Sequence, residues 1–288
     1  MSAAPMQITG ICRFSYLATR GWKKTAAHDV DETAAVLFAS ERMDRRFELF
    51  EGLCLPSIAA QTDTDFKLVL LTAGSLPPEW RARLEAAVEP YPNIVVHRIR
   101  PRLMPEAVTM ALRRTVAADG PPVVQFCLDD DDALSVNYVA RLREMAGAVL
   151  ASRLAEQLPV ALNVPRGLSI GDRGDGFVLS ETFAPYLALG LAVVTGPDIP
   201  INAYTWPHRR VPTRMVALSD PGPMSWINGL HGHHDSAGLV KGRSHGVSPE
   251  KLSGYIAEEF PFLTEDRVTL AFGDEAVRAF KAAGSSSG

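Results

Sequence analysis

Four consecutive aspartates, Asp129, Asp130, Asp131 and Asp132, directly follow an apolar run at residues 123–128. Such a run is typical of a buried strand in a parallel sheet, and open α/β folds bind ligands at the carboxyl ends of these strands. Carboxylates crowded at that edge repel one another unless a cation neutralises them, and hard oxygen ligands favour Mg²⁺ or Mn²⁺. Side chains alternate along an extended segment, so we expect only one pair, Asp129 with Asp131 or Asp130 with Asp132, to share an ion. The plain alternative is a solvated helix N-terminus in which one aspartate caps the helix that follows.

The elements that position these aspartates alternate between two sequence patterns. Short β-branched or apolar runs predict strands at residues 7–14, 66–72, 94–99 and 123–128. Amphipathic segments between them predict helices at residues 44–60, 79–88 and 106–118. This alternation is typical of βαβ units, so the predicted fold class is α/β, a Rossmann-like open and mostly parallel sheet.

The second half of the chain is less regular. Apolar spacing predicts a helix at residues 136–158, and a region rich in glycine and proline then runs from 165 to 223. We expect a smaller mixed or antiparallel part there, packed on the first sheet, with a short strand at 176–179. Two helices, 249–258 and 274–283, should close the structure. We therefore divide the chain into a first half at 1–132, a second half of the same domain at 133–248, and C-terminal helices with a tail at 249–288.

The composition excludes several classes of protein. The 288 residues carry a formal charge of −4 without long clusters of Lys and Arg, which argues against nucleic-acid binding. Cys12, Cys54 and Cys127 are odd in number and far apart, so we expect no disulfide framework and a reducing compartment. The most apolar stretch, residues 183–195, is shorter than the roughly 20 residues of a membrane helix. No signal peptide is evident, and we expect a cytoplasmic protein without an integral membrane segment.

Several segments together resemble a known family. Residues 55–61 (LPSIAAQ), followed by the strand at 66–72, look like the first helix-to-strand passage of A-type glycosyltransferases, and residues 128–133 (LDDDDA) resemble the LDxDD form of their DxD motif. Further matches narrow the resemblance to a bacterial group described as putative rhamnosyltransferases: residues 13–16 (RFSY) with 21–22 (GW), 46–51 (RFELFE), and 226–228 (WIN) with 231–232 (HG). The resemblance covers roughly residues 10–245.

This resemblance implies a nucleotide-diphosphate sugar as donor, bound by the first half of the chain, with Mn²⁺ or Mg²⁺ bridging its diphosphate to the aspartates. On that basis Asp131 is a direct metal ligand, and Asp129 contacts the ion or the ribose. Asp130 joins the donor-binding residues, while Asp132 faces the donor sugar as a catalytic candidate. The acceptor would be a hydroxyl group, for instance of a surface glycan, and any membrane contact would be peripheral and made through that acceptor.

The loop after the first strand surrounds the nucleobase in A-type enzymes. Here the first strand runs through Arg13 into a loop that contains Tyr16 and Trp22. We expect Tyr16 or Trp22 to stack on the base and Arg13 to meet phosphate oxygens, although Trp22 could simply pack the loop. A second basic group, at residues 208–210 (HRR), could likewise face a diphosphate or an acidic acceptor.

The histidines cluster near the end of the matching region. His231, His233, His234 and His245 lie within fifteen residues. The resemblance predicts that His231 or His234 completes the metal shell, and Asp235, next to them, is a candidate base for the acceptor hydroxyl. Two alternatives stay open for this segment: a glycine-rich surface loop, and the HxHxDH motif of binuclear metallohydrolases.

The hydrolase motif is matched by His231, His233 and Asp235, but Ser236 stands where its last histidine belongs. The sequence therefore predicts a metal-dependent glycosyltransferase, with rhamnose as the sugar suggested by the family. The alternatives are a binuclear metallohydrolase and a non-catalytic protein that binds nucleotide sugars.

Overall fold

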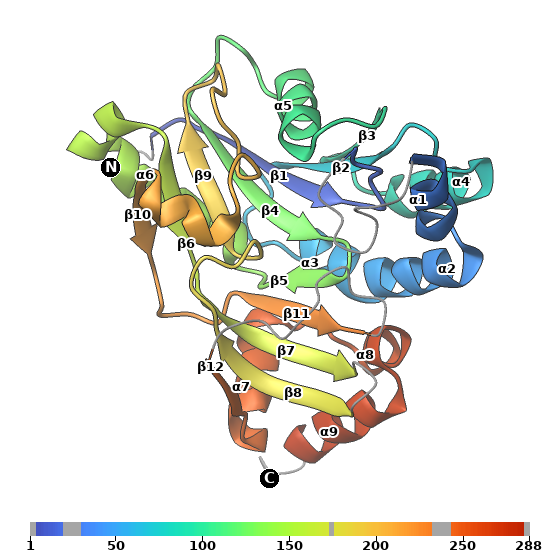
Figure 1. Ribbon diagram of the computed structural model, residues 1–288. Coiled ribbons are helices and arrows are strands. Elements are labelled where there is room, and N and C mark those ends of the chain that lie inside the picture. Colours follow the sequence, from blue (N-terminus) through green and yellow to red (C-terminus); the bar gives the residue numbers. More distant parts are fainter. Residues whose placement is uncertain (1–3, 20–29, 173–175, 232–242, 285–288) are drawn as a thin grey trace.

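The protein is built on two sheets that lie one above the other in Figure 1. The computed structural model describes residues 4–19, 30–172, 176–231 and 243–284. The larger sheet has the strand order β10-β6-β9-β4-β1-β2-β3. Its strands are β1 (Gln7–Arg13), β2 (Lys67–Ala73), β3 (Ile94–Ile99), β4 (Val123–Asp129), β6 (Val160–Asn163), β9 (Leu191–Thr195) and β10 (Val216–Ser219).

Most neighbours in the larger sheet are parallel. Strands β4, β1, β2 and β3 pair in parallel, as do β10 and β6, whereas β9 is antiparallel to both β4 and β6. The predicted open, mostly parallel α/β sheet is therefore confirmed. Strands β6, β9 and β10 come after residue 132 in the chain. Residues 133–248 therefore contribute strands to the larger sheet in addition to forming a smaller sheet.

Helices cover both faces of the larger sheet. The helices of the first half are α1 (Val30–Leu37), α2 (Ser40–Leu49), α3 (Leu55–Ala59), α4 (Pro78–Val88) and α5 (Met104–Thr115). Apolar residues of α2, α3 and α4 pack with Leu68, Leu70 and Phe126 on one face. Helix α5 packs on the other face, against Ile11, Val69 and Leu71. This two-sided burial explains the nearly continuous apolar runs of the strands.

The helix predicted at 44–60 begins earlier and is not regular. A π-helical turn, Phe50–Cys54, joins α2 to α3. Gly52 lies in this turn, where an added Cβ would be 3.2 Å from the carbonyl oxygen of Arg267. The helix predicted at 136–158 ends earlier, because α6 (Tyr138–Leu150) gives way to a 3₁₀ turn, Arg153–Gln157, in which the Leu154 N–H donates to the Ser152 side chain as an N-cap.

The smaller sheet is mixed, as expected, and has the order β12-β8-β7-β11-β5. Its strands are β5 (Asp132–Leu134), β7 (Arg166–Asp172), β8 (Phe177–Phe183), β11 (Trp226–Leu230) and β12 (Arg243–Gly246). Helices α7 (Pro249–Glu259), α8 (Glu265–Phe272) and α9 (Asp274–Gly284) lie against it (Figure 1). They pack on one face through Leu168, Ile170 and Ile227. Helix α8 was not predicted from the sequence.

Two further expectations concern the chain as a whole. Cys12, Cys54 and Cys127 are all free and buried, in agreement with the absence of a disulfide framework. Among the described residues, no helix combines the length and hydrophobicity that a bilayer crossing requires.

Candidate active site

The acidic run lies where the two sheets meet. Strand β4 ends at Asp129, the chain turns at Asp130 and Asp131, and β5 begins at Asp132. Because of this turn, the alternation expected for an extended segment does not hold. Asp129, Asp131 and Asp132 each offer an oxygen within 4.8 Å of the others, so three carboxylates form one group instead of two separate pairs.

Asp130 lies apart from that group and is paired with a buried arginine. Its side chain is 1% exposed, and its Oδ1 accepts a hydrogen bond of 2.6 Å from Nη1 of Arg46 on α2. The same Nη1 donates to Asp131 Oδ2 at 2.9 Å. Burial raises the pKa of Asp130 to about 7, although the Arg46 charge opposes this. The prediction that Asp130 binds the donor stays untested, and here its carboxylate is directed to Arg46.

Arg46 was not assigned a role from the sequence, yet a signal was present. It lies four residues before Phe50, on the apolar stripe of its helix, and its side chain is 8% exposed. A charged residue on a buried stripe requires a partner of opposite charge. The acidic run supplies that partner.

Asp132 is held by the neighbouring strand of the smaller sheet. Asn228 pairs with Asp132 in the antiparallel register of β11 and β5, and its Nδ2 donates to Asp132 Oδ1 at 2.8 Å. The backbone N–H of Gly229 donates to the same oxygen at 3.1 Å. Burial, and then the charges of Asp131 and Asp129, raise the pKa of Asp132 well above its usual range. An added Cβ at Gly229 would lie 2.1 Å from the carbonyl oxygen of Asp131, so the close approach of the two segments requires glycine.

Asp129 is bound by Arg13. The two are register partners at the carboxyl ends of β4 and β1. Arg13 donates from Nε to Asp129 Oδ1 at 2.7 Å and from Nη2 to Oδ2 at 2.6 Å, a bidentate arrangement. The guanidinium carbon lies 5.7 Å from the ring centroid of Tyr204, which is favourable for a cation–π contact.

His231 reaches the acidic turn from the far end of β11. Its Nε2 lies 2.8 Å from Asp131 Oδ2, and its side chain is 4% exposed. Burial lowers the pKa of His231, although Asp131 opposes the shift, so a neutral imidazole that donates through Nε2 fits this contact. His245 is on β12, at the opposite edge of the smaller sheet from β5, and is not part of this group.

Other predicted site residues are less centrally placed or lie outside the described residues. The Tyr16 ring is buried, and its hydroxyl donates to the Arg100 carbonyl oxygen and accepts from the Arg102 N–H. Stacking on a nucleobase would require the ring to leave this position. Burial lowers the pKa of His208, and the nearby charges of Asp129 and Arg13 also act on this pKa, in opposite directions. The residues outside the described part of the chain are Trp22, His233, His234 and Asp235.

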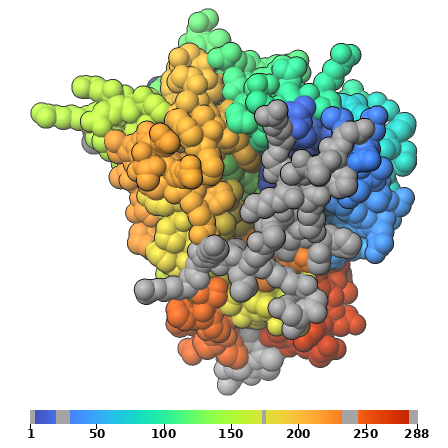
Figure 2. All heavy atoms as spheres, in the orientation of Figure 1, coloured from blue at the N-terminus to red at the C-terminus, as the bar shows by residue number. Residues whose placement is uncertain are grey.

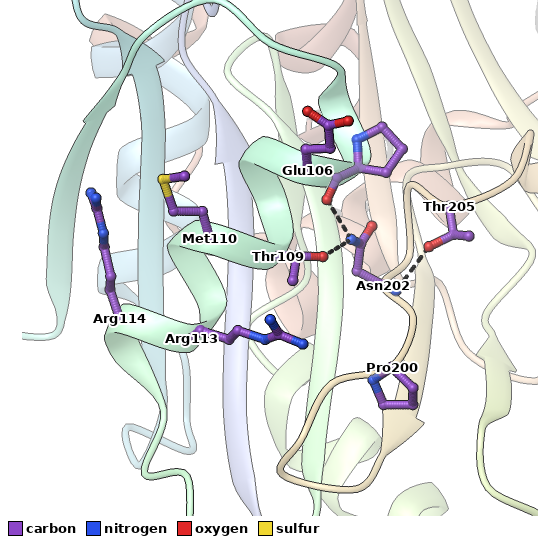
Figure 3. Close-up of a pocket in the computed structure, with 9 residues that line it drawn as sticks. Glu106, Thr109, Met110, Arg113, Arg114, Pro200, Asn202 and Thr205 are labelled. Carbon is purple, nitrogen blue, oxygen red and sulfur yellow. Dashed lines mark hydrogen bonds between the residues drawn. The ribbon is translucent and has the colours of Figure 1, made fainter.

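A cleft of about 620 Å³ is lined by residues of α5 and of the segment after β9. Asn202 anchors this segment to α5, since its Nδ2 donates to the Pro105 carbonyl oxygen and to Thr109 Oγ1, both at 2.8 Å (Figure 3). Figure 2 shows the segment (light orange) at the surface beside α5 (green). The anchored segment carries Tyr204 and, further on, His208, so these contacts position the aromatic ring beneath Arg13.

Comparison with known proteins gives one family and distant structural similarity. Residues 7–243 match the family model described as "Putative rhamnosyl transferase". The chain is similar to S. aureus TarS 1-349, solved with UDP-GlcNAc, at 14% identity and a TM-score of 0.40 over 97% of this chain and 73% of that one. It is similar to a mannosyltransferase of Pyrobaculum calidifontis, solved with GDP-Man and Mn²⁺, at 13% identity and a TM-score of 0.37 over 77% and 56%. A search of curated proteins gives no match.

Proposed function

Because the chain belongs to the putative rhamnosyl transferase family, we propose that it transfers a sugar from a nucleotide-diphosphate donor to a hydroxyl acceptor at the group formed by Asp129, Asp131 and Asp132. The observation that carries this proposal is the convergence of three carboxylates where the carboxyl end of β4 meets the smaller sheet. Open α/β folds bind their ligands at such strand ends.

The residues present fit a divalent metal. Three carboxylates bring ligand atoms within 4.8 Å of one another, and Asp131 and Asp132 are buried. Burial and mutual repulsion raise the pKa of Asp132, and a divalent cation would relieve that repulsion. Oxygen ligands alone favour Mg²⁺ or Mn²⁺ over softer metals. We therefore assign Asp129, Asp131 and Asp132 as the residues that would hold the ion, and His231 as a further ligand or as the group that orients Asp131.

When bound, the ion would stabilise the negative charge that develops on the nucleoside diphosphate as the bond to the sugar breaks. The protein's own residues have separate tasks. Asp131 is oriented by Arg46 and His231, and Asp132 is fixed by Asn228 and Gly229, facing the donor sugar. Arg13 is the last residue of β1 and lies beside Asp129, where it would meet the phosphate oxygens of the donor.

The proposal also names a sugar, an acceptor and a compartment. Rhamnose is the sugar that the family's description suggests. A glycan hydroxyl, as in surface polysaccharide synthesis, is our proposal for the acceptor. The three free cysteines are compatible with the cytoplasm as the place of synthesis.

The first experiment is a thermal-shift panel with UDP, GDP, CDP and dTDP, each with and without Mn²⁺. A ligand that binds only the folded state raises the melting temperature by mass action. We expect one diphosphate to stabilise the protein in the presence of Mn²⁺ and to do so weakly or not at all without it. Stabilisation by Mn²⁺ with no further effect of any nucleotide would refute the transferase proposal and favour a metallohydrolase. Binding of nucleotide with neither transfer nor slow donor hydrolysis would indicate a non-catalytic binding protein.

A further inference from the structure

Among the residues that the structure describes, two arginines contact the acidic run, and their surroundings differ. Arg46 is 8% exposed and bonds to Asp130, which is 1% exposed, and to Asp131, which is 11% exposed. The Arg13 side chain is 37% exposed and its partner Asp129 28%. A buried ion pair is costly to break because it leaves an uncompensated charge, whereas a partly exposed one exchanges its partner at small cost. Arg46 is therefore fixed, and Arg13 is able to move.

Arg13 also contacts the carboxylate oxygens of Asp129, the atoms through which Asp129 would bind a metal. Its Nε and Nη2 donate to both carboxylate oxygens, at 2.7 and 2.6 Å. Asp129 is one of the three carboxylates that converge on the candidate metal position. A guanidinium and a divalent ion on one carboxylate repel each other and compete for the same oxygen lone pairs.

We propose that Arg13 is an exchangeable cation that occupies Asp129 until metal and donor arrive, and then transfers its bidentate contact to the donor's diphosphate. The inference rests on the proposed function, because it requires a metal at the aspartates and a diphosphate beside them. A guanidinium binds phosphate oxygens in the same fork geometry in which it binds a carboxylate. Tyr204 lies under the guanidinium, 5.7 Å away, and offers the side chain an aromatic surface along which to shift.

The exchange couples the two ligands. In the absence of nucleotide, Arg13 lowers the affinity for metal by competing at Asp129. A bound diphosphate draws Arg13 away, so it raises the affinity for metal, and by linkage the metal raises the affinity for diphosphate by the same factor. The coupling would make metal binding depend on the donor.

The test measures Mn²⁺ binding by calorimetry without nucleotide, in wild type, Arg13→Met and Arg13→Lys. Removing the competitor should tighten Mn²⁺ binding in Arg13→Met by about two- to fivefold, the factor that corresponds to a partly exposed ion pair. Arg13→Lys keeps the charge and loses the fork, so its affinity should lie between the two. In the background of Asp129→Asn, replacing Arg13 by Met should no longer change the affinity, which completes a double-mutant cycle.

Arg46→Lys provides the matched control from the buried arginine. It loosens Asp131 without freeing Asp129, so Mn²⁺ binding should weaken where Arg13→Met tightens it. With Mn²⁺ present, the diphosphate that stabilises wild type should bind more weakly to Arg13→Met. Circular dichroism melting of each variant verifies that it is folded.

The failure of this inference differs from the failure of the proposed function. If wild type binds Mn²⁺ together with a diphosphate but Arg13→Met binds Mn²⁺ no more tightly than wild type, the exchange is refuted and the transferase proposal stands. If Arg13→Lys equals wild type while Arg13→Met is tighter, long-range charge accounts for the effect and the exchange is again refuted. If wild type binds neither Mn²⁺ nor any of UDP, GDP, CDP and dTDP, both proposals fall.

Discussion

His231 Nε2 lies 2.8 Å from Asp131 Oδ2 and so joins the end of β11 to the turn after β4, one hundred residues earlier in the chain. The same oxygen accepts a hydrogen bond from Arg46 on α2. Within the described part of the chain, donors from two separate elements therefore orient this carboxylate before any ligand binds. Such outer contacts to metal-binding carboxylates usually influence metal affinity strongly.

Gln61 should be a large contributor to stability, because it ties the end of α3 to the start of α6. Its Nε2 donates to the carbonyl oxygens of Ser57 and Ser135, at 2.8 and 2.7 Å, and its Oε1 accepts from the Val139 N–H at 3.0 Å. The side chain is buried, so Gln61→Ala leaves backbone groups unsatisfied and should lower the free energy of unfolding by about 2–4 kcal/mol. Urea denaturation measures this loss.

Gln7 provides the control for that measurement. It also makes three hydrogen bonds to backbone, with Ala117 N, Ala117 O and Pro121 O, but two of them are exposed to water. Water replaces the lost partners there, so Gln7→Ala should cost roughly 1 kcal/mol or less. Equal losses for the two variants would contradict the role given to Gln61.

Asn228 should matter for metal binding rather than for the fold. Asn228→Ala removes the 2.8 Å hydrogen bond to Asp132 and leaves only the Gly229 N–H on that oxygen among the described contacts. We expect Mn²⁺ affinity, measured by calorimetry, to fall by roughly 10- to 100-fold, as for other outer contacts to metal ligands.

Asn163→Ala is the matched amide deletion. Asn163 on β6 is buried, donates to Ser219 Oγ and accepts from the Tyr186 N–H, both at 2.9 Å, and contacts neither the aspartates nor Arg13 in the described contacts. Its removal should lower the melting temperature but leave Mn²⁺ affinity unchanged. An Asn228→Ala protein that binds Mn²⁺ as wild type does would show that Asp132 needs no such support.

His97 should make stability depend on pH. Burial, followed by the charge of Arg114, lowers the pKa of His97 below 6.5, and its Nε2 lies 3.0 Å from Thr115 Oγ1. The Thr115 hydroxyl donates to the Ala111 carbonyl oxygen, so its oxygen accepts from a neutral His97. The unfolded chain takes up a proton near pH 6.5 and the folded protein only at lower pH, so stability falls on acidification through that range.

Urea denaturation of wild type and His97→Gln at about pH 8 and about pH 5.5 isolates this effect. The advantage of wild type over the variant should be larger at the higher pH. Arg114→Gln should reduce the pH dependence, because it removes one cause of the lowered pKa. A wild-type advantage that grows on acidification would mean that His97 is protonated in the folded state.

The first four strands were predictable because each is a short β-branched or apolar run, the pattern that is typical of a buried strand. Residues 94–99 form β3 as predicted, and β4 extends the expected strand by one residue, Asp129. The position of the aspartates at the end of that strand follows directly. Helix α8 has eight residues, about two turns, which is too short for its apolar spacing to indicate a helix clearly.

The contacts within the site were harder to predict, since they depend on which distant segments pair. Asn228 meets Asp132 only because β11 runs antiparallel to β5, and nothing near either residue indicates that pairing. The grouping of Asp129, Asp131 and Asp132 depends on the turn that ends β4, which four identical residues do not reveal. The bond of Arg46 to Asp130 could be predicted in part, because Arg46 lies on the apolar stripe of its helix and so requires an acidic partner.

The central claim is that Asp131 holds a metal on which nucleotide binding depends. Its most direct test compares Asp131→Asn with Asp119→Asn, since Asp131 follows β4 and the exposed Asp119 precedes it, at the other end of the strand. The melting temperature of each protein is measured with Mn²⁺ and the diphosphate that stabilises wild type, relative to the same protein without ligand. We predict that Asp119→Asn keeps the full shift and that Asp131→Asn loses it. A shift of wild-type size in Asp131→Asn would contradict the account.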